Sequence, residues 1–267
     1  MIKIIFSDMD GTLLTSENKL PEGFDAMIAE LKKRGVIFAP ASGRQYFSLL
    51  DSFTKYEDEF LFLAEGGTLV MYHGKEIFSQ PLDKNLALEV LEEGGKLNNI
   101  LCVYCGKNNA YIRDFQDLPV YRAELFKYYT HAATVKSWDE IDDVPIKVSF
   151  FDPVGNSQES IFSTIKKFSD RAQIIVSSIH WVDTVRTGVD KGLAVRKIQQ
   201  LLDIKPEECA AFGDYLNDCE MMQAVCYSFA MSNAHPDLKK FAKFETVSND
   251  EGGVLVGIKK LMEMGLI

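Results

Sequence analysis

The chain lacks any long apolar run and any cluster of basic residues. No run reaches the roughly 18 apolar residues that a membrane-spanning helix requires. No basic leader followed by a long apolar segment marks a signal peptide. The 39 Asp and Glu residues outnumber the 29 Lys and Arg residues, so the formal net charge is -10, the opposite of a nucleic-acid-binding surface. We therefore expect a soluble, cytoplasmic protein that binds neither membranes nor nucleic acid, and no protein partner is evident.

Cysteine and histidine are scarce and scattered, which argues against a thiol or imidazole metal centre. The five cysteines include one CxxC pair, Cys102 and Cys105. This pair lies in an alternating segment typical of a strand, whereas a redox motif is expected to open a helix. No second CxxC completes a zinc site, and the four histidines show no helical pairing. We expect these cysteines to be structural.

Short apolar runs alternate with helical periodicity at both ends of the chain. Strands are expected near residues 4–6, 36–39, 61–64, 209–212 and 227–231. Helices are expected from residue 21, from residue 191 and after residue 252. Successive strands joined by a helix form βαβ units with parallel strands. This pattern predicts an α/β core with a doubly wound, mainly parallel sheet.

The middle of the chain has a different pattern. Strand-like pairs are mixed with helices, with strands expected at 101–104, 110–112, 146–151, 173–177 and 181–186 and helices at 85–97, 120–129 and 160–168. Such a mixture indicates an α+β domain with antiparallel pairing. We expect a core domain of residues 1–82 and 186–267 and an inserted domain of residues 83–185, with 267 residues sufficient for both.

Two aspartates, Asp8 and Asp10, follow the first buried strand directly. Carboxylates this close repel each other unless a cation or a shared proton lies between them. Oxygen ligands of this kind suit Mg²⁺. The alternative is a solvated turn, because Asp and Gly are ordinary turn residues.

A hydroxyl, a glycine and a cation follow the second strand as Ser42, Gly43 and Arg44. Ligands collect at the carboxyl ends of parallel strands, so this segment should lie beside the aspartates. The hydroxyl and exposed backbone N–H groups can bind phosphate oxygens. Alternatively, Ser42 caps a helix and Arg44 is a solvated residue in its first turn.

The last two segments of interest place more charges at strand and helix ends. Lys191 begins a helix, where the helix dipole is unfavourable for a cation unless a negative partner lies nearby. Asp214 follows a buried strand, and Asp218 lies one helical turn further on. The alternatives are a solvated lysine, and helix capping by Asp214 or Asn217.

Four segments together carry a family resemblance: Asp8-Met-Asp-Gly-Thr12, Ala41-Ser-Gly-Arg44, Asp190-Lys-Gly192 and Gly213-Asp-Tyr-Leu-Asn-Asp218. In this order they resemble the haloacid dehalogenase superfamily of phosphohydrolases, and more narrowly its Cof-type sugar-phosphatase branch. The resemblance spans most of the chain. It implies a Rossmann-like core and an inserted α+β cap of type IIB, which would cover the aspartate loop and select the substrate.

The resemblance also implies a mechanism. Asp8 would attack phosphorus and form an aspartyl-phosphate, and Asp10 would act as general acid and then general base. Mg²⁺ would be held by Asp8, the backbone carbonyl of Asp10 and Asp214, with Lys191 assisting. Asp218 would hold the waters of Mg²⁺ or orient Lys191. Phosphate oxygens would be bound by the backbone N–H of Met9 and by Ser42, Gly43, Arg44, Lys191 and Asn217.

The expected substrate is a small phosphorylated metabolite, above all a sugar phosphate, with pyridoxal phosphate and flavin mononucleotide as alternatives. A phosphohexomutase would use the same aspartates. A non-catalytic phosphoacceptor module would also show an acidic Mg²⁺ site and a lysine, but Asp10 argues against it because a neighbouring acid-base group promotes hydrolysis. The polar loop of residues 106–109 is a candidate substrate contact in the cap.

Overall fold

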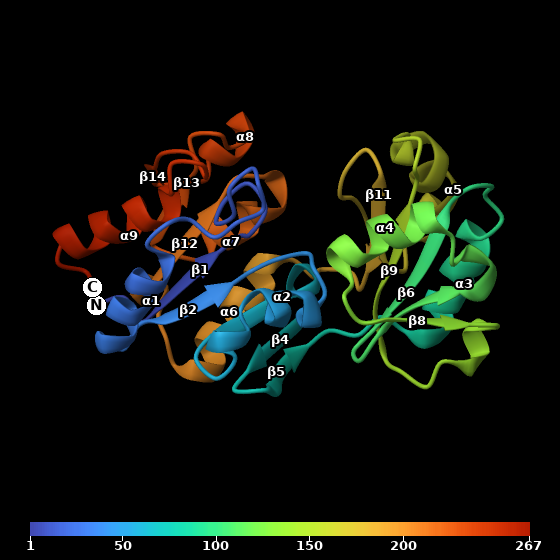
Figure 1. The fold of residues 1–267 in the computed structure, drawn as a ribbon, viewed down its shortest axis with the longest axis horizontal. Coiled ribbons are helices and arrows are strands. Elements are labelled where there is room, and N and C mark those ends of the chain that lie inside the picture. Colours follow the sequence, from blue (N-terminus) through green and yellow to red (C-terminus); the bar gives the residue numbers. More distant parts are fainter. The chain divides into compact units, whose positions relative to one another are not determined.

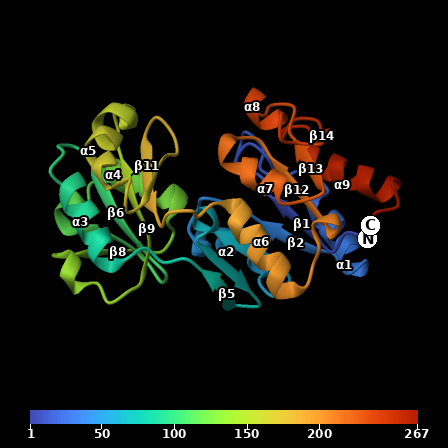
Figure 2. The same cartoon turned by 180° about the vertical axis from the view of Figure 1, so that it is seen from behind.

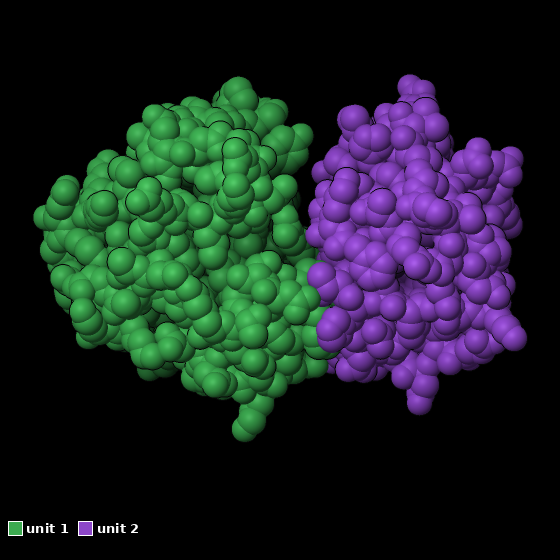
Figure 3. Space-filling view, viewed as in Figure 1, with its two compact units in different colours: residues 1–78, 190–267 green, residues 79–189 purple.

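The chain folds into two compact units, shown in different colours in Figure 3. This computed structural model describes all residues from 1 to 267. The core unit comprises Met1–Phe78 and Asp190–Ile267, and the insert unit comprises Ser79–Val189. The insert unit thus begins four residues before the expected position 83 and ends four residues after the expected position 185.

A five-stranded parallel sheet organises the core unit (Figure 1). Its order is β14-β13-β12-β1-β2, and all four pairings are parallel. The strands are β1 (Ile4–Ser7), β2 (Ile37–Pro40), β12 (Cys209–Gly213), β13 (Tyr227–Ala230) and β14 (Phe244–Glu245). The expected doubly wound parallel sheet is confirmed. The central strand β1 lies between β2 and β12, so the connections diverge there. In sheets of this kind, ligands bind outside the carboxyl ends of the strands at such a point.

A second, three-stranded sheet continues from β2. It contains β3 (Leu61–Ala64), β4 (Leu69–Tyr72) and β5 (Lys75–Ser79) in that order. A parallel bridge between Ala41 and Leu63 joins its first strand to the main sheet. A tight hairpin turn joins β4 and β5, with positive φ angles of 50° at His73 and 66° at Gly74.

The helices of the core unit form where apolar residues recur at helical spacing. They are α1 (Phe24–Lys33), α2 (Tyr46–Ser52), α6 (Lys191–Leu202), α7 (Cys219–Gln223), α8 (Pro236–Lys239) and α9 (Gly253–Glu263). Figure 2 shows α6 along its whole length. Gly257 of α9 packs directly on the rings of Phe212 and Phe229, where a Cβ would lie 2.3 Å from Phe212. This contact fixes α9 on the sheet.

The insert unit is an α+β domain around a six-stranded sheet of order β10-β11-β9-β6-β7-β8. The strands are β6 (Leu101–Gly106), β7 (Ala110–Arg113), β8 (Ala132–Val135), β9 (Pro145–Phe151), β10 (Gln173–Val176) and β11 (Trp181–Val185). All pairings are antiparallel except that of β7 with β8. The helices are α3 (Lys84–Gly94), α4 (Pro119–Tyr128) and the single turn α5 (Ser163–Ile165). The expected α+β class is confirmed.

Short helical turns complete both units. They are the 3-10 turns Thr54–Tyr56, Glu65–Gly67, Asp114–Gln116, Trp138–Glu140, Lys166–Phe168, Pro206–Glu208 and Leu216–Asp218, and the π turn Gln158–Phe162. The sheet of the insert unit has a separate apolar core on each face, one built with α3 and α5 and the other with α4. No helix of the chain combines the length and apolarity that crossing a membrane would need.

Candidate active site

Three charged side chains meet at the carboxyl end of the central strand. Asp8 follows β1, Lys191 begins α6, and Asp218 ends the 3-10 turn after β12. The ammonium of Lys191 donates to Oδ1 of Asp8 at 2.5 Å and to Oδ1 of Asp218 at 2.7 Å. The lysine is only 1% exposed. The negative partners expected for a lysine at a helix start are therefore present, and the interpretation as a solvated lysine is wrong.

Asp218 has a bonding partner on each oxygen. While Oδ1 accepts from Lys191, Oδ2 accepts from the backbone N–H of Asp214 at 3.1 Å and of Tyr215 at 3.3 Å. Gly213 permits this turn, because a Cβ there would lie 2.6 Å from Oδ2 of Asp218. Asp218 thus caps the turn itself, and neither Asp214 nor Asn217 does. Its geometry suits orientation of Lys191 better than direct metal ligation.

Asp214 is held beside the aspartate loop by a residue for which sequence reasoning gave no role. Thr12 donates its hydroxyl to Oδ1 of Asp214 at 2.8 Å. Gly11 has φ of +78°, and a Cβ at this position would lie 2.5 Å from Oδ2 of Asp214. The two loops can approach this closely only with glycine here. Thr12 is the last residue of the Asp8–Thr12 motif, and this position is the feature of the sequence that could have indicated its role.

Side-chain oxygens of Asp8, Asp214 and Asp218 lie within 4.8 Å of one another. Three carboxylates and one ammonium leave an excess of negative charge in a largely buried place. Hard carboxylate oxygens are the donors that Mg²⁺ takes in proteins. The donor set fits a divalent cation. Asp8 and Asp214 are the better placed ligands, because Lys191 bonds only Oδ1 of Asp8 and Thr12 bonds only Oδ1 of Asp214. The Oδ2 atom of each aspartate is therefore left for the cation.

Burial and crowding of charge shift the proton affinities in this cluster. Burial raises the pKa of Asp8 well above its ordinary value, and the neighbouring Asp218 and Asp214 add to this while Lys191 opposes it. Burial likewise raises the pKa of Asp214 to about 6, against the hydrogen bond from Thr12. Burial alone would lower the pKa of Lys191, but the two adjacent carboxylates raise it above its usual range. A divalent cation would relieve the repulsion among the aspartates.

Asp10 points to a different partner. Arg44 donates from Nε to Oδ2 of Asp10 at 3.0 Å and from a terminal nitrogen to Oδ1 at 2.5 Å. The side chain of Asp10 is 49% exposed and that of Arg44 16% exposed. Arg44 precedes α2, which begins at Tyr46, so it is not the solvated first-turn residue of the alternative interpretation. This bidentate pair joins the loops after β1 and β2.

The remaining expected residues lie in the segments that follow β1, β2 and β12. Ser42 is 2% exposed and accepts the N–H of Arg44 at 3.1 Å; it does not cap α2, whose N-cap is Gln45. The N–H of its neighbour Ala41 donates to the carbonyl of Ser7, which places this loop next to Asp8. Three residues expected to bind phosphate are the buried Met9 and the exposed Gly43 and Asn217.

A further loop that the sequence did not single out supports the site. Asn233 donates its side-chain amide to the carbonyl of Gly11 at 2.8 Å, and its own oxygen accepts the N–H of Asn249 at 3.1 Å.

In the insert unit, hydrogen bonds to Asp143 hold the candidate contact loop 106–109 in place. This carboxylate accepts hydrogen bonds from the backbone N–H groups of Asn108 and Asn109 at 2.9 Å and 3.2 Å. It also accepts one from the side-chain amide of Asn108.

A doubly wound sheet with a lysine-paired aspartate after its central strand, beside a second acidic loop, defines an α/β protein with a carboxylate centre at the carboxyl end of the sheet. Residues 5–258 match the model of the haloacid dehalogenase-like hydrolases, and the chain belongs to this family. It is 33% identical to 5-amino-6-(5-phospho-D-ribitylamino)uracil phosphatase YbjI of Escherichia coli, over 98% of this chain and 97% of that protein.

Solved structures share the fold over the whole chain. A Streptococcus mutans protein, 24% identical, aligns with a TM-score of 0.86 over 98% of this chain and 100% of its own. A sugar phosphatase of haloacid dehalogenase subclass IIB, 20% identical, aligns with a TM-score of 0.80 over 99% of this chain and 100% of its own. The fold is thus that of this family with its inserted cap domain, and the protein is a phosphatase of the family.

Proposed function

We propose that this protein is a Mg²⁺-dependent phosphomonoesterase that acts through an aspartyl-phosphate on Asp8. The observation that carries the proposal is the buried carboxylate of Asp8, bound by Lys191 at the carboxyl end of the central strand. A carboxylate here is held in one place and partly neutralised, as a nucleophile toward an anionic phosphate must be.

The chemistry divides into two displacements. A carboxylate oxygen of Asp8 forms a bond to phosphorus while the bond from phosphorus to the substrate's ester oxygen breaks. Asp10 in its protonated form gives a proton to the departing oxygen. Asp10 then takes a proton from water, whose oxygen attacks phosphorus, and Asp8 is released together with inorganic phosphate.

Asp8, Asp214 and the backbone carbonyl of Asp10 are the proposed holders of Mg²⁺, and Asp218 orients Lys191. When bound, the cation would neutralise charge on the transferring phosphoryl group. Thr12 fixes Asp214 for this role. The backbone N–H of Met9 and residues Ser42, Gly43 and Asn217 would bind phosphate oxygens.

Arg44 could control when the carboxyl of Asp10 is available for proton transfer. It is the bidentate partner of Asp10, and its guanidinium also suits phosphate oxygens. An incoming phosphate would compete with Asp10 for this arginine. Binding of substrate would then release the carboxyl of Asp10 for proton transfer, at the moment when the leaving group needs it.

The proposed substrates are small phosphorylated metabolites, above all sugar phosphates. The Escherichia coli relative is named for a substrate whose phosphate is on a ribityl chain, which supports this class. Selection among them is proposed to rest on the insert unit, because none of the chemical groups above belongs to it. A phosphohexomutase is the second candidate, and product analysis on hexose phosphates distinguishes the two.

The test is phosphate release across a panel of phosphate esters. We expect turnover that is lost in a chelator and restored by Mg²⁺. Asp8→Asn should abolish it, Asp10→Asn should reduce it about 10²–10⁴-fold, and Asp58→Asn, an exposed aspartate of the core unit, should leave it unchanged. Rapidly quenched wild-type enzyme should carry one phosphoryl group on Asp8 by mass spectrometry. Near-normal turnover by Asp8→Asn would show that another group attacks phosphorus.

A further inference from the structure

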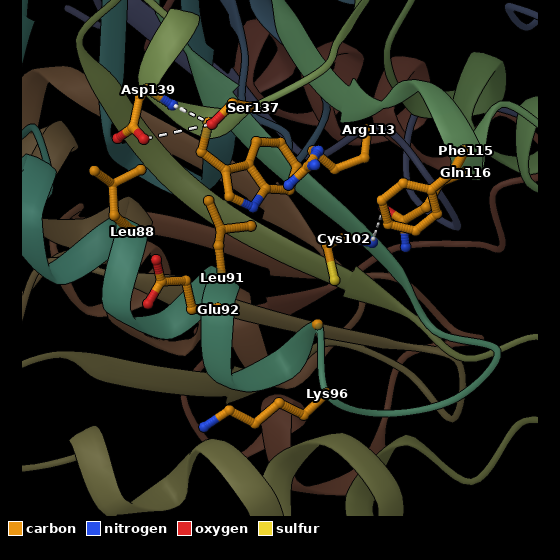
Figure 4. A pocket seen from close by; sticks show the side chains of 12 residues that line it. Leu88, Leu91, Glu92, Lys96, Cys102, Arg113, Phe115, Gln116, Ser137 and Asp139 are labelled. Atoms are coloured by element: carbon orange, nitrogen blue, oxygen red, sulfur yellow. Dashed lines mark hydrogen bonds between the residues drawn. The ribbon is translucent and has the colours of Figure 1, made fainter.

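The insert unit contains a pocket of its own beside the second half of α3 (Figure 4). Its volume is about 260 Å³. The lining includes Leu88 and Leu91 of α3, Cys102 of β6, Arg113 of β7, and the ring residues Phe115 and Trp138. Every lining residue belongs to the insert unit, so the pocket is complete without the core unit.

Arg113 is the unusual member of this lining. Its Nε is buried and has no hydrogen-bond partner. Its guanidinium carbon lies 5.4 Å from the ring centre of Phe115 and 5.7 Å from that of Trp138. These rings hold the cation in place, but they do not satisfy its N–H donors in the plane of the guanidinium. A buried polar donor without a partner calls for an acceptor.

The other polar groups at the pocket do not supply this acceptor. Gln116 is bonded to the backbone, because its amide donates to the carbonyl of Ile100 and its oxygen accepts from Cys102. Asp139 accepts from Ser137, and Lys96 is paired with Glu93. Burial raises the pKa of the Cys102 thiol to about 12, so this group is neutral and does not repel an anion. Two carboxylates, Glu92 and Asp139, also belong to the lining, but neither forms a hydrogen bond or an ion pair with Arg113. The Nε of Arg113 is thus a buried donor at the pocket that still lacks an acceptor.

We propose that this pocket binds a small organic carboxylate, whose anionic end accepts hydrogen bonds from Arg113 and whose apolar body packs against Leu88, Leu91 and Trp138. The guanidinium fork matches a carboxylate in geometry and charge. The lining combines the apolar side chains of Leu88, Leu91 and Trp138 with a small number of charged groups, which is the usual composition of a ligand site. The volume lies just below the range of roughly 300–1,000 Å³ for drug-sized ligands, which leaves room for a single-ring carboxylate such as benzoate.

The experiment is a titration of the full-length protein with benzoate, followed by tryptophan fluorescence. The chain has two tryptophans, so in a Trp181→Phe background the signal comes from Trp138 at the pocket. We expect saturable quenching by benzoate and none by benzyl alcohol, a neutral molecule of the same shape. Arg113→Gln should weaken benzoate binding at least tenfold. Arg122→Gln, which removes an exposed arginine of the same unit paired with Asp117, should leave it unchanged.

Two further variants keep the outcome decisive. If Arg113→Gln fails to fold by circular dichroism, Arg113→Lys retains the charge without the Nε donor and should still weaken binding several-fold. Asp8→Asn should bind benzoate as the parent does, which separates this site from the proposed catalytic centre. Equal binding of benzyl alcohol and benzoate, or unchanged affinity in a folded Arg113 variant, would overturn the proposal. So would tighter binding of phenylphosphonate than of benzoate, because the pocket would then select phosphate-like anions.

Discussion

The ammonium of Lys191 lies fully buried between two carboxylates, and each of the three charges depends on the others. Removal of the cation would leave Asp8 and Asp218 facing each other with little access to water. The desolvation cost of each charge would then stand without the attraction that offsets it. The same lysine that positions the proposed nucleophile is therefore also part of the stability of the core unit.

We predict that Lys191→Met lowers the free energy of unfolding by about 3–5 kcal/mol at pH 8, the usual effect of breaking a buried ion pair. Urea denaturation measures this change. Lys197→Met, on the same helix but bonded only to Gln200 at the surface, is the matched control and should change stability by less than about 0.5 kcal/mol. The double variant Lys191→Met/Asp218→Asn should recover part of the loss. Equal stability of the two lysine variants would mean that the buried charges are compensated in another way.

Thr12 offers a test of the proposed metal site that leaves the reacting groups untouched. Thr12→Val keeps the shape of the side chain but removes the donor to Asp214. We predict that the Mg²⁺ concentration for half-maximal activity rises about 10–100-fold, while the rate at saturating Mg²⁺ stays close to that of the parent, because partners that orient a metal ligand act mainly on affinity. Thr12→Ser should restore the parent value. A loss of rate at all Mg²⁺ concentrations would instead give Thr12 a role in the chemistry.

At the residue scale, the sequence predicted where the charged residues of the site lie better than it predicted their hydrogen-bond partners. Asp8, Lys191 and Asp214 could be located because each stands where a strand ends or a helix begins, and those places converge in a parallel sheet. The pairing of Asp10 with Arg44 could not be predicted, because it depends on how two loops turn after separate strands. The role of Thr12 was missed for a similar reason: a hydroxyl beside a glycine is common in turns, and its partner lies 202 residues away in the chain.

At the scale of elements, clear periodicity was informative and short irregular segments were not. The helix with Phe24, Met27, Ile28 and Leu31 is present with those four residues buried. The strand β8 was missed, because Ala132–Val135 is only half-buried and pairs with β7 along one edge. The expected helix at 160–168 is a succession of π, α and 3-10 turns. Apolar spacing alone does not distinguish among these turns, which bury similar residues.

The turn between β6 and β7 is built around one carboxylate. Asp143 accepts from the backbone of Asn108 and Asn109 and from the hydroxyl of Tyr111, and Gly106 lies so close that a Cβ would be 2.3 Å from its Oδ2. Asp143 is 8% exposed, so these donors would be left without partners if it were removed. The turn thus depends on a residue more than thirty positions further along the chain.

We predict that Asp143→Ala destabilises the insert unit by about 2–4 kcal/mol, since each buried group left unsatisfied costs about 1–3 kcal/mol. Hydrogen exchange should show faster exchange at the amides of Asn108 and Asn109. Asp142→Ala, the exposed neighbour, is the matched control and should leave both amides protected. Unchanged protection in Asp143→Ala would show that the strands alone hold this turn.

On the scale of the whole molecule, the groups proposed for catalysis all belong to the core unit, whereas the insert unit has apolar cores of its own. Both segments of the core unit contribute to the acidic cluster, Asp8 from the first and Asp214 and Asp218 from the second. A bound cation would therefore tie together two parts of the chain that flank an insert of more than a hundred residues. The insert unit has a separate sheet and two apolar cores, so we expect its stability not to depend on that cation.

We predict that saturating Mg²⁺ slows hydrogen exchange in the loops after β1 and β12 and at the start of α6, and leaves residues 79–189 unchanged. A ligand that binds only the folded state at about 100 times its dissociation constant adds about 2.7 kcal/mol of stability, and here that increment belongs to the core unit alone. Exchange followed by mass spectrometry with and without Mg²⁺ measures it. Asp214→Asn should remove the Mg²⁺ effect from the loops, whereas Asp250→Asn, a surface aspartate that accepts from the Ser16 backbone, should retain it. Comparable protection of the insert unit would show that the two units unfold together, and that the cation stabilises the molecule as one cooperative body.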